Sequence, residues 1–332
     1  MTTTTEKSPD MSHQWKCGCH GRVDVHHHLS PPIWVKELKE RGLLEPPCEN
    51  WTIEKSLADM DEGGVETAML SITTPALSLT GMSIGTVATL ARQCNEYAAK
   101  IVAAYPGRFG FFATVPLTDH DSALREIEYA LDVLKADGIA LLTSYGNSWL
   151  GDPKFFPVLS ELNRRSAVVS THPTTANCCV NIQPEIHPSI IEFGTDTTRA
   201  IASLIVNGGA KRFRNIKWIF SHAGGTMPFL IERFIRLPVF APHLTEEYPD
   251  GVRRELQNFY YDTAQVAHKA AMSGLVSLVE TSQILFGTDF PYRRSNEHAE
   301  GLKGCGIFDE ADLRKIDFEN AHRIFPSLIT KN

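Results

Sequence analysis

Short apolar runs alternate with longer amphipathic segments along most of this chain. Most of the runs are continuously apolar, which is typical of parallel β-strands that are covered on both faces. The segments between them repeat apolar residues at three- and four-residue steps, as in residues 87–101, and this spacing predicts helices. Eight runs predict strands: 22–26, 65–72, 108–115, 138–143, 167–171, 216–221, 259–262 and 283–287.

Strands that alternate with helices predict an α/β fold of parallel strands joined by right-handed crossovers. An open doubly wound sheet and a closed barrel share this alternation. A nucleotide-binding open sheet has a glycine-rich phosphate loop after its first strand, whereas the first run here continues into His26-His27-His28. Gly224 and Gly225 follow a later run, but two glycines alone are a weak signal. The sequence therefore favours a (β/α)8 TIM-type barrel.

The length of 332 residues suits one barrel with short additions. The start of the chain is polar and threonine-rich, so we expect a flexible N-terminal tail (1–20) followed by a single catalytic domain (21–332). The formal net charge of −7 argues against a nucleic-acid-binding protein. No apolar run is long enough to span a membrane and no secretory signal is visible, so we expect a cytoplasmic location without membrane contact.

Seven cysteines are scattered along the chain, which is typical of free thiols in a reducing compartment. Cys17, Cys19 and His20 resemble half of a zinc site. A structural zinc ion needs four ligands, and this cluster has no matching second pair. We therefore do not predict a structural zinc site at this cluster.

Residues with metal-binding side chains occur where several predicted strands end. His26 and His28 follow the first strand, His172 the fifth, His222 the sixth and Asp289 the eighth. The carboxyl ends of all strands in a barrel meet at one face, and that face holds the active site. Alternate residues of a strand point the same way, so His26 and His28 can share a metal while the histidine between them faces elsewhere.

We predict that His26, His28, His172 and Asp289 hold one divalent metal ion. Three imidazoles and a carboxylate suit zinc, and also manganese or iron(II); Zn²⁺ is the first choice and Mn²⁺ the alternative. His222 is left as a catalytic acid/base group beside the metal, because imidazole exchanges protons near neutral pH. Asp289 is the other candidate proton donor. The fourth run, 138–143, offers no lysine or acid to bridge a second metal.

Asp24 has the parity of His26 and His28 but lies deeper in the predicted barrel, so we expect it to support the ligands. The histidines outside the strand ends are interpreted as surface or loop residues. They are His13, His20, His120, His187, His243, His268, His298 and His322.

The order of these motifs resembles the decarboxylase branch of the amidohydrolase superfamily. The motifs are His26-x-His28, His172-Pro173, Ser221-His222-Ala223-Gly224-Gly225 and Phe286-Gly287-Thr288-Asp289-Phe290-Pro291-Tyr292. The resemblance covers nearly all of residues 21–326, including Tyr260-Tyr261-Asp262-Thr263 and Glu319-Asn320-Ala321. No single motif is diagnostic, but the ordered set is a strong signal. It implies one metal on the four predicted ligands, with His222 adjacent.

This branch includes 2-amino-3-carboxymuconate-6-semialdehyde, resorcylate and 6-methylsalicylate decarboxylases. A glutamate can replace the first histidine in relatives, so His26 brings this chain nearer the muconate-semialdehyde and methylsalicylate members. The resemblance also implies a substrate-binding arginine after the sixth-strand glycines, which in some members crosses a dimer interface. Arg233 is the matching position, and a surface ion-pair arginine is the alternative interpretation. A homodimer or higher homo-oligomer is the family expectation.

The implied reaction is the non-oxidative decarboxylation of a small aromatic carboxylate, with a salicylate-type acid such as 6-methylsalicylate expected first. Metal chelation of the carboxylate and the ortho-hydroxyl would fix the ring, and protonation of the ring carbon would precede loss of carbon dioxide. Two alternatives stay open: 2-amino-3-carboxymuconate-6-semialdehyde decarboxylation, and hydrolysis of a lactone or amide on the same scaffold. A barrel that only binds a ligand is disfavoured, because four strand ends retain their candidate functional side chains.

Aromatic residues that follow the predicted strands are candidates for a substrate-ring pocket. Trp34 follows the first strand, Tyr145 and Trp149 follow the fourth, and Phe290 and Tyr292 follow the eighth. We favour Trp34 and Phe290 as substrate-binding residues over ordinary loop packing.

Overall fold

The computed structural model describes residues 21–329, so the predicted tail (1–20), with Cys17, Cys19 and His20, lies outside the described residues. Within residues 21–329, eight parallel strands form one sheet in the order β1-β2-β3-β4-β7-β8-β9-β10. These strands are β1 (Arg22–His28), β2 (Val65–Ser71), β3 (Phe109–Thr114), β4 (Gly138–Leu142), β7 (Val168–His172), β8 (Lys217–Phe220), β9 (Tyr260–Asp262) and β10 (Ile284–Leu285). Each predicted run coincides with one of them.

Backbone hydrogen bonds between β1 and the segment that follows β10 close the sheet into a ring. The amide of Val25 donates to the carbonyl of Phe286 at 2.9 Å, and the amide of His28 donates to the carbonyl of Phe290 at 2.8 Å. His27 and Phe290 form a parallel bridge between the same two segments. The predicted (β/α)8 barrel is therefore confirmed.

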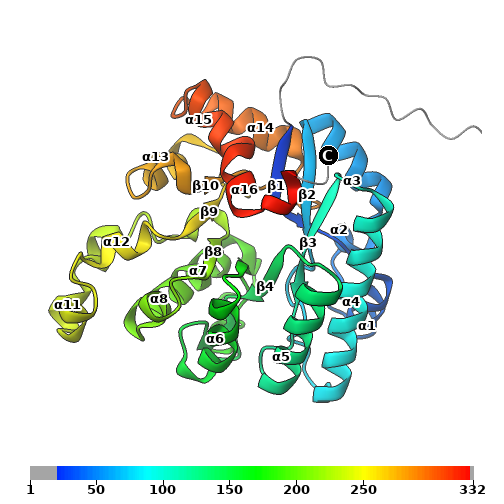
Figure 1. Cartoon of the computed structure of the whole chain (residues 1–332), viewed down its shortest axis with the longest axis horizontal. Helices are drawn as coiled ribbons and strands as arrows, with labels where there is room; N and C mark the ends of the chain where they lie inside the picture. The colour runs from blue at the N-terminus through cyan, green and yellow to red at the C-terminus, as the bar shows by residue number, and fades with distance from the viewer. Residues whose placement is uncertain (1–20, 330–332) are drawn as a thin grey trace, which may run out of the picture.

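Helices surround the strands, and the short helices α11 and α12 extend away from the barrel (Figure 1). A small antiparallel hairpin, β5 (Ser144–Tyr145) and β6 (Ser148–Trp149), follows β4. The helices are α1 (Pro32–Glu40), α2 (Pro46–Glu49), α3 (Ile53–Gly63), α4 (Ile84–Ala104), α5 (His120–Glu128), α6 (Phe156–Arg164), α7 (Pro188–Val206), α8 (Gly209–Arg212), α9 (Ile231–Phe234), α10 (Leu237–Phe240), α11 (His243–Glu247), α12 (Val252–Leu256), α13 (Lys269–Val276), α14 (Ser295–Gly304), α15 (Glu310–Arg314), α16 (Asn320–Ile324) and α17 (Pro326–Ile329).

Apolar side chains fill the amino-terminal half of the barrel interior. Val25, Met69, Phe112, Ile219 and Leu285 come from five different strands and form one buried cluster. Side chains of α16 and α17 belong to the same cluster and close this end of the barrel. The carboxyl end is therefore left to polar side chains, as in other barrels of this type. Among the helices within residues 21–329, none is both long and apolar enough to cross a bilayer.

Candidate metal centre

A register shift in β1 turns two histidines into the barrel. The pairing of β1 with β2 shifts between Asp24 and His27, where a residue is added to one strand. The side chains of His26 and His28 therefore face the same space, while His27 faces away from it and contacts Asp24. Asp24 thus shares its side with His27 and not with His26 and His28, so the parity assigned to it from the sequence is wrong. The register shift is the reason.

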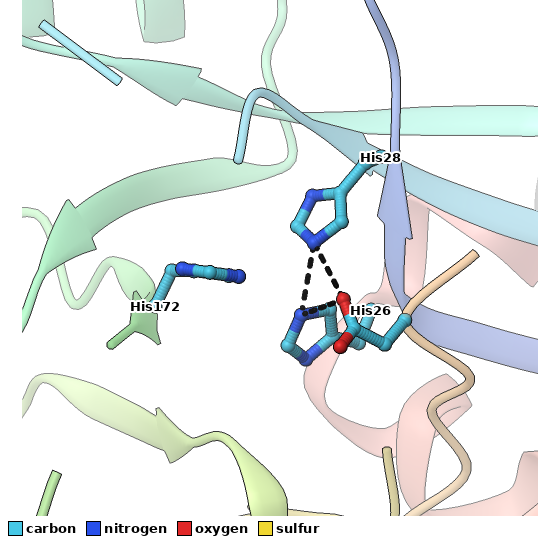
Figure 2. Close-up of side chains that lie close together, drawn as sticks. His26, His28 and His172 are labelled. Carbon is cyan, nitrogen blue, oxygen red and sulfur yellow. Dashed lines mark hydrogen bonds and ion pairs between the residues drawn. The ribbon is translucent and has the colours of Figure 1, made fainter. Parts of the chain in front are cut away.

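Three imidazoles and one carboxylate converge at the carboxyl end of the barrel. One ligand-type atom from each of His26, His28, His172 and Asp289 lies within 4.8 Å of the other three, and all four residues are buried. Figure 2 shows the rings of His26, His28 and His172 directed toward a shared space. Ligand atoms about 2.1 Å from one ion lie no more than about 4.2 Å apart, so small side-chain adjustments would suffice to bind a metal.

Hydrogen bonds at the far side of each ring orient its inner nitrogen. Nδ1 of His26 faces a carboxylate oxygen of Asp262 at 2.8 Å. Nδ1 of His28 faces the carbonyl oxygen of Ser71 at 3.2 Å, and Nδ1 of His172 faces the carbonyl oxygen of Pro173 at 2.8 Å. These oxygens only accept hydrogen bonds, so each neutral ring carries its hydrogen on Nδ1. Each Nε2 then presents a lone pair, which is the form that binds a metal.

The inner atoms lie too close together to be left without a positive charge. Nε2 of His26 and Nε2 of His28 are 3.2 Å apart. Oδ1 of Asp289 lies 2.9 Å from Nε2 of His28 and 3.4 Å from Nε2 of His26. Three acceptor atoms at these distances require either a shared proton or a cation among them. The donor set therefore fits a divalent metal.

The electrostatics of the metal-free site agree with this arrangement. Burial lowers the pKa of His28, and burial together with the neighbouring imidazoles lowers the pKa of His172 well below its usual value. Burial also disfavours the charged form of His26, but the carboxylates of Asp262 and Asp289 outweigh it and raise the pKa of His26 well above its usual value. Burial opposes ionisation of Asp289, yet His26 and the adjacent imidazoles hold its pKa well below the usual range.

Asp262, at the end of β9, connects the ligands to His222. One of its oxygens binds Nδ1 of His26, and the other accepts the backbone amides of His222 at 2.8 Å and Ala264 at 3.1 Å. His222 has a positive φ of 53°, a conformation that costs energy for a residue other than glycine. The bond to Asp262 helps to hold it there. Asp262 belongs to one of the motifs of the family resemblance, but its role was not predicted, because strand-end spacing gives no signal for a carboxylate that supports other residues.

Nε2 of His222 is buried and has no hydrogen-bond partner within the described part of the chain. It lies 3.5 Å from Oδ2 of Asp289, which also accepts a hydrogen bond from the Gln265 amide at 2.9 Å. His222 and Asp289 both face a cavity of about 420 Å³. An unpartnered imidazole nitrogen beside a carboxylate in a cavity is suited to exchange a proton with a ligand.

The cavity has an apolar, partly aromatic wall. Phe193, on α7, meets the edge of His172 at a ring distance of 6.2 Å, and Tyr292 meets the edge of His28 at 6.1 Å. None of the described residues around the cavity is lysine or arginine. The lining residues are Glu45, Thr73, Thr74, His172, His187, Ser189, Ile190, Phe193, Gly194, His222, Gly225, Thr226, Gln265, Val266, Asp289 and Tyr292.

Three residues proposed to bind substrate are not part of this wall. Trp34 is completely buried and donates its indole hydrogen to the carbonyl of Ala76 at 2.9 Å. Phe290 stacks on His27 with ring centroids 4.6 Å apart, on the side away from the cavity. Arg233 is exposed on α9 and does not line the cavity. Trp34 and Phe290 are therefore packing residues in this chain, and Arg233 does not reach the cavity of its own subunit.

Sequence reasoning also missed residues that support or line the site. Phe193 lies on a helix well beyond the strand end, so only knowledge of the fold brings it to the cavity. His298 was expected at the surface, but it is buried and its Nε2 accepts the backbone amide of Gln265 at 2.8 Å. This bond helps to place the side chain of Gln265 against Asp289. Tyr292 was among the weighed candidates and does line the cavity.

A model of the amidohydrolase family matches residues 23–327. The chain belongs to the amidohydrolase family. This amidohydrolase is 37% identical over 323 residues to the decarboxylase yanB of Aspergillus niger, which covers 92% of this chain and 87% of the relative. It is 38% identical over 329 residues to the 6-methylsalicylic acid decarboxylase acuB of Aspergillus aculeatus, covering 92% of this chain and 96% of the relative.

Solved structures support the fold of this amidohydrolase. A dihydroxybenzoic acid decarboxylase from Polaromonas, with bound manganese and the inhibitor 2-nitroresorcinol, superposes with a TM-score of 0.80. The match covers 93% of this chain and 97% of that chain at 21% identity. The family model and the two relatives confirm the family that the motifs resembled.

Proposed function

We propose that this protein is a metal-dependent decarboxylase of a small aromatic carboxylate with an ortho-hydroxyl, and that 6-methylsalicylate is its first substrate to test. The observation that carries this proposal is the pair formed by His222 and Asp289, which faces a cavity directly beside the cluster of metal-ligand atoms. Decarboxylation is favoured over hydrolysis because the relatives of 37% and 38% identity are decarboxylases, and this chain matches 87% and 96% of their lengths.

The metal would be held by His26, His28, His172 and Asp289. When bound there, a divalent cation would supply the positive charge that favours binding of a substrate carboxylate and ortho-hydroxyl. Three imidazoles and one carboxylate suit Zn²⁺, which stays the first choice. Mn²⁺ is the alternative, and manganese is bound in the Polaromonas decarboxylase.

His222 and Asp289 act together in delivering a proton. Their facing atoms are 3.5 Å apart and both line the cavity, so a proton can pass between them or to a water beside them. The proton adds to the ring carbon that bears the carboxylate. The carbon–carbon bond then breaks, its electron pair returns to the ring, and carbon dioxide leaves. Gln265 holds Oδ2 of Asp289 in place during this step through its amide hydrogen bond.

The substrate ring would pack against the apolar wall of the cavity, which is formed by Phe193, Tyr292, Ile190 and Val266. Aromatic side chains favour edge and offset contacts with a planar ring. This wall replaces the substrate contacts assigned to Trp34 and Phe290 from the sequence. We expect a flat, singly ringed acid to fit better than an extended aliphatic one.

We infer that the protein forms a homodimer or higher homo-oligomer, and that Arg233 contributes its charge to the site of a neighbouring subunit. The cavity in one subunit has no lysine or arginine among its described lining residues, although its substrate is an anion. Phe229, Val239 and Phe240 lie in the segment around Arg233 and are 90%, 67% and 80% exposed. Exposed apolar side chains of this size favour association. A cytoplasmic location is consistent with five free cysteines in residues 21–329.

The decisive experiment combines metal analysis with product analysis. Purified protein is assayed for bound metal, then loaded with Zn²⁺ or Mn²⁺ and incubated with 6-methylsalicylate, salicylate and 2,6-dihydroxybenzoate. We expect one metal per chain and release of carbon dioxide with 3-methylphenol from 6-methylsalicylate. Activity toward 2-amino-3-carboxymuconate-6-semialdehyde alone would reassign the substrate, and cleavage of lactones or amides without carbon dioxide would reassign the reaction as hydrolysis.

A further inference from the structure

The middle residue of the histidine triplet does not line the cavity, yet both of its ring nitrogens have a hydrogen-bond partner. His27 is completely buried. Its Nδ1 lies 3.0 Å from a carboxylate oxygen of Asp24, and its Nε2 lies 3.0 Å from the hydroxyl of Ser56 on α3. A serine, a histidine and an aspartate in this order have the arrangement of a hydrolytic triad.

Burial excludes a nucleophilic role for this serine, although its hydrogen bonds run in the same direction as in a hydrolytic triad. The Asp24 carboxylate only accepts hydrogen bonds, so Nδ1 of a neutral His27 donates to it and Nε2 accepts the hydroxyl of Ser56. The indole nitrogen of Trp51 donates to the hydroxyl oxygen of Ser56 at 3.0 Å. Ser56 is completely buried as well, and no substrate atom can reach it. The relay therefore runs inward, from Trp51 through Ser56 and His27 to Asp24.

Asp24 passes this constraint to the loop that carries Asp289. One oxygen of Asp24 accepts the backbone amides of His26 at 3.0 Å and Thr288 at 3.1 Å. Its other oxygen accepts the hydroxyl of Thr288 at 2.6 Å in addition to His27. The Asp24 carboxylate thus accepts from four donors, and it holds the backbone of the predicted ligand His26 and of Thr288, the residue before the predicted ligand Asp289. Removing one donor would let the carboxylate rotate toward the others.

Asp289 needs such support because its backbone is strained. Its φ is +72°, which a residue other than glycine adopts only when the surroundings hold it there. The amide of Asp289 donates to the carbonyl of His26 at 2.8 Å, and the hydroxyl of Thr288 accepts the amide of Phe290 at 3.1 Å. Both bonds depend on the backbone of His26 and of Thr288, and Asp24 accepts hydrogen bonds from both. A shift in Thr288 would therefore displace the carboxylate of Asp289 from the two imidazoles.

We propose that His27 is a positioning residue whose bond to Asp24 sets the place of Asp289 in the metal centre. This inference rests on the proposed function, because it assumes that Asp289 is a metal ligand. The role is one of geometry, since His27 touches neither the cavity nor the candidate ligand atoms.

Two substitutions of His27 separate positioning from packing. An asparagine amide can replace Nδ1 and donate to Asp24, whereas a glutamine amide extends to the position of Nε2 and reaches Ser56 instead. If packing alone matters, the larger glutamine is the better replacement. We expect His27→Gln to weaken Mn²⁺ binding about 10- to 100-fold, as loss of a supporting contact does elsewhere. His27→Asn should lose clearly less affinity, and kcat should follow the same order with KM little changed.

The measurement is calorimetric titration of the metal-free full chain with Mn²⁺, together with the melting temperature of each variant. Equal affinities in the two variants, or tighter binding by His27→Gln, would overturn the proposal. Should both variants fail to fold, Thr288→Ser and Thr288→Val test the next link, because only serine keeps the hydroxyl donated to Asp24. Equal Mn²⁺ affinity in that pair would overturn the proposal as well. A wild-type chain that binds no Mn²⁺ or Zn²⁺ would instead reject the proposed function itself.

Discussion

The two oxygens of Asp289 have different surroundings, which suit one oxygen to metal binding and the other to proton exchange. Oδ1 lies among the imidazole nitrogens of His26 and His28, where a metal ligand is expected. Oδ2 faces His222 and accepts the amide of Gln265. One carboxylate can therefore contribute charge to a metal and also communicate with an acid/base group. His222 faces Oδ2 of Asp289 and stacks on the ring of His26, with ring centroids 5.2 Å apart, and it is not one of the four candidate ligands.

Substitution of these two residues should consequently give different phenotypes. We expect His222→Asn to lower kcat by roughly 10²- to 10⁴-fold, the usual contribution of a positioned acid/base group, while the metal content stays at the wild-type level. Asp289→Asn should lower both kcat and metal content, because it removes the anionic ligand. Metal analysis and steady-state kinetics on the same preparations provide the measurement. Near-normal turnover in His222→Asn would remove this residue from the mechanism.

At the scale of single residues, the sequence predicts the groups that belong to strand ends and little else. His26, His28, His172 and Asp289 could be proposed because each follows a strand, and strand ends meet in a barrel. Asp262 also ends a predicted strand, but its role was not proposed, since it orients other side chains and a lone aspartate has many possible roles. Phe193 comes from a helix, whose position relative to the cavity depends on the loop before it.

Besides the bond to Asp262, one close contact between elements helps to determine where His222 lies. The short helix η4 (His222–Gly224) follows β8 and is followed by Gly225, whose backbone meets that of Gly194 on α7. A Cβ on Gly225 would come within 2.0 Å of the carbonyl oxygen of Gly194. Gly225 also has φ +67° and ψ −127°, a region open in practice to glycine alone. The approach of η4 to α7 thus requires glycine here.

The pair Gly225→Ala and Gly42→Ala tests this requirement. Both glycines have φ +67°, but a Cβ added to Gly42 would have no atom of another residue within 4 Å beyond its chain neighbours. We expect Gly42→Ala to reduce the free energy of unfolding by about 1–2 kcal/mol through backbone strain alone. Gly225→Ala should cost about 3–5 kcal/mol, because a backbone clash is added to the strain. Urea denaturation followed by circular dichroism compares them. Equal losses would show that the contact with Gly194 is relaxed without cost.

At the scale of elements, periodicity predicted the strands but not their local irregularities. Continuous apolar runs gave all eight barrel strands, since each is covered on both faces. The register shift in β1 was invisible, because the residues around Asp24 and His27 suit a regular strand equally well. Strand β10 is shorter than the predicted run 283–287; directly after it, the amide of Phe286 donates to the carbonyl of Ile316 at 3.0 Å.

For the molecule as a whole, the metal-free centre should hold one proton in place of the metal. The pKa of His26 is raised well above its usual value because Asp262 and Asp289 outweigh its burial. Below this raised pKa the metal-free protein therefore keeps His26 protonated, and a metal must displace that proton to bind. Metal affinity should accordingly rise with pH until the raised pKa of His26 is passed. The lowered pKa values of His28 and His172 mean that these two rings add no proton release near neutral pH.

This linkage can be measured directly. Titration of the metal-free protein with Zn²⁺ at pH 7, in buffers of different ionisation enthalpy, should report release of about one proton per metal bound. His26→Asn should abolish most of this release and weaken binding. His322→Asn, which alters a histidine outside the centre, is the control and should leave the proton count unchanged. A count near zero in the wild type would contradict the protonated His26.

The association of subunits determines whether one chain is sufficient for activity. Phe229 and Phe240 are among the most exposed apolar side chains in residues 21–329 and flank Arg233 in sequence. We expect the double variant Phe229→Glu/Phe240→Glu to run as a monomer in light scattering, because two charges would oppose burial of this segment. Val133→Glu, at an exposed position outside it, should not change the mass. If Arg233 acts across the interface, the monomeric double variant and Arg233→Ala should lose activity to the same extent. Only the double variant should dissociate. A fully active monomer would show that each active site is formed by a single chain.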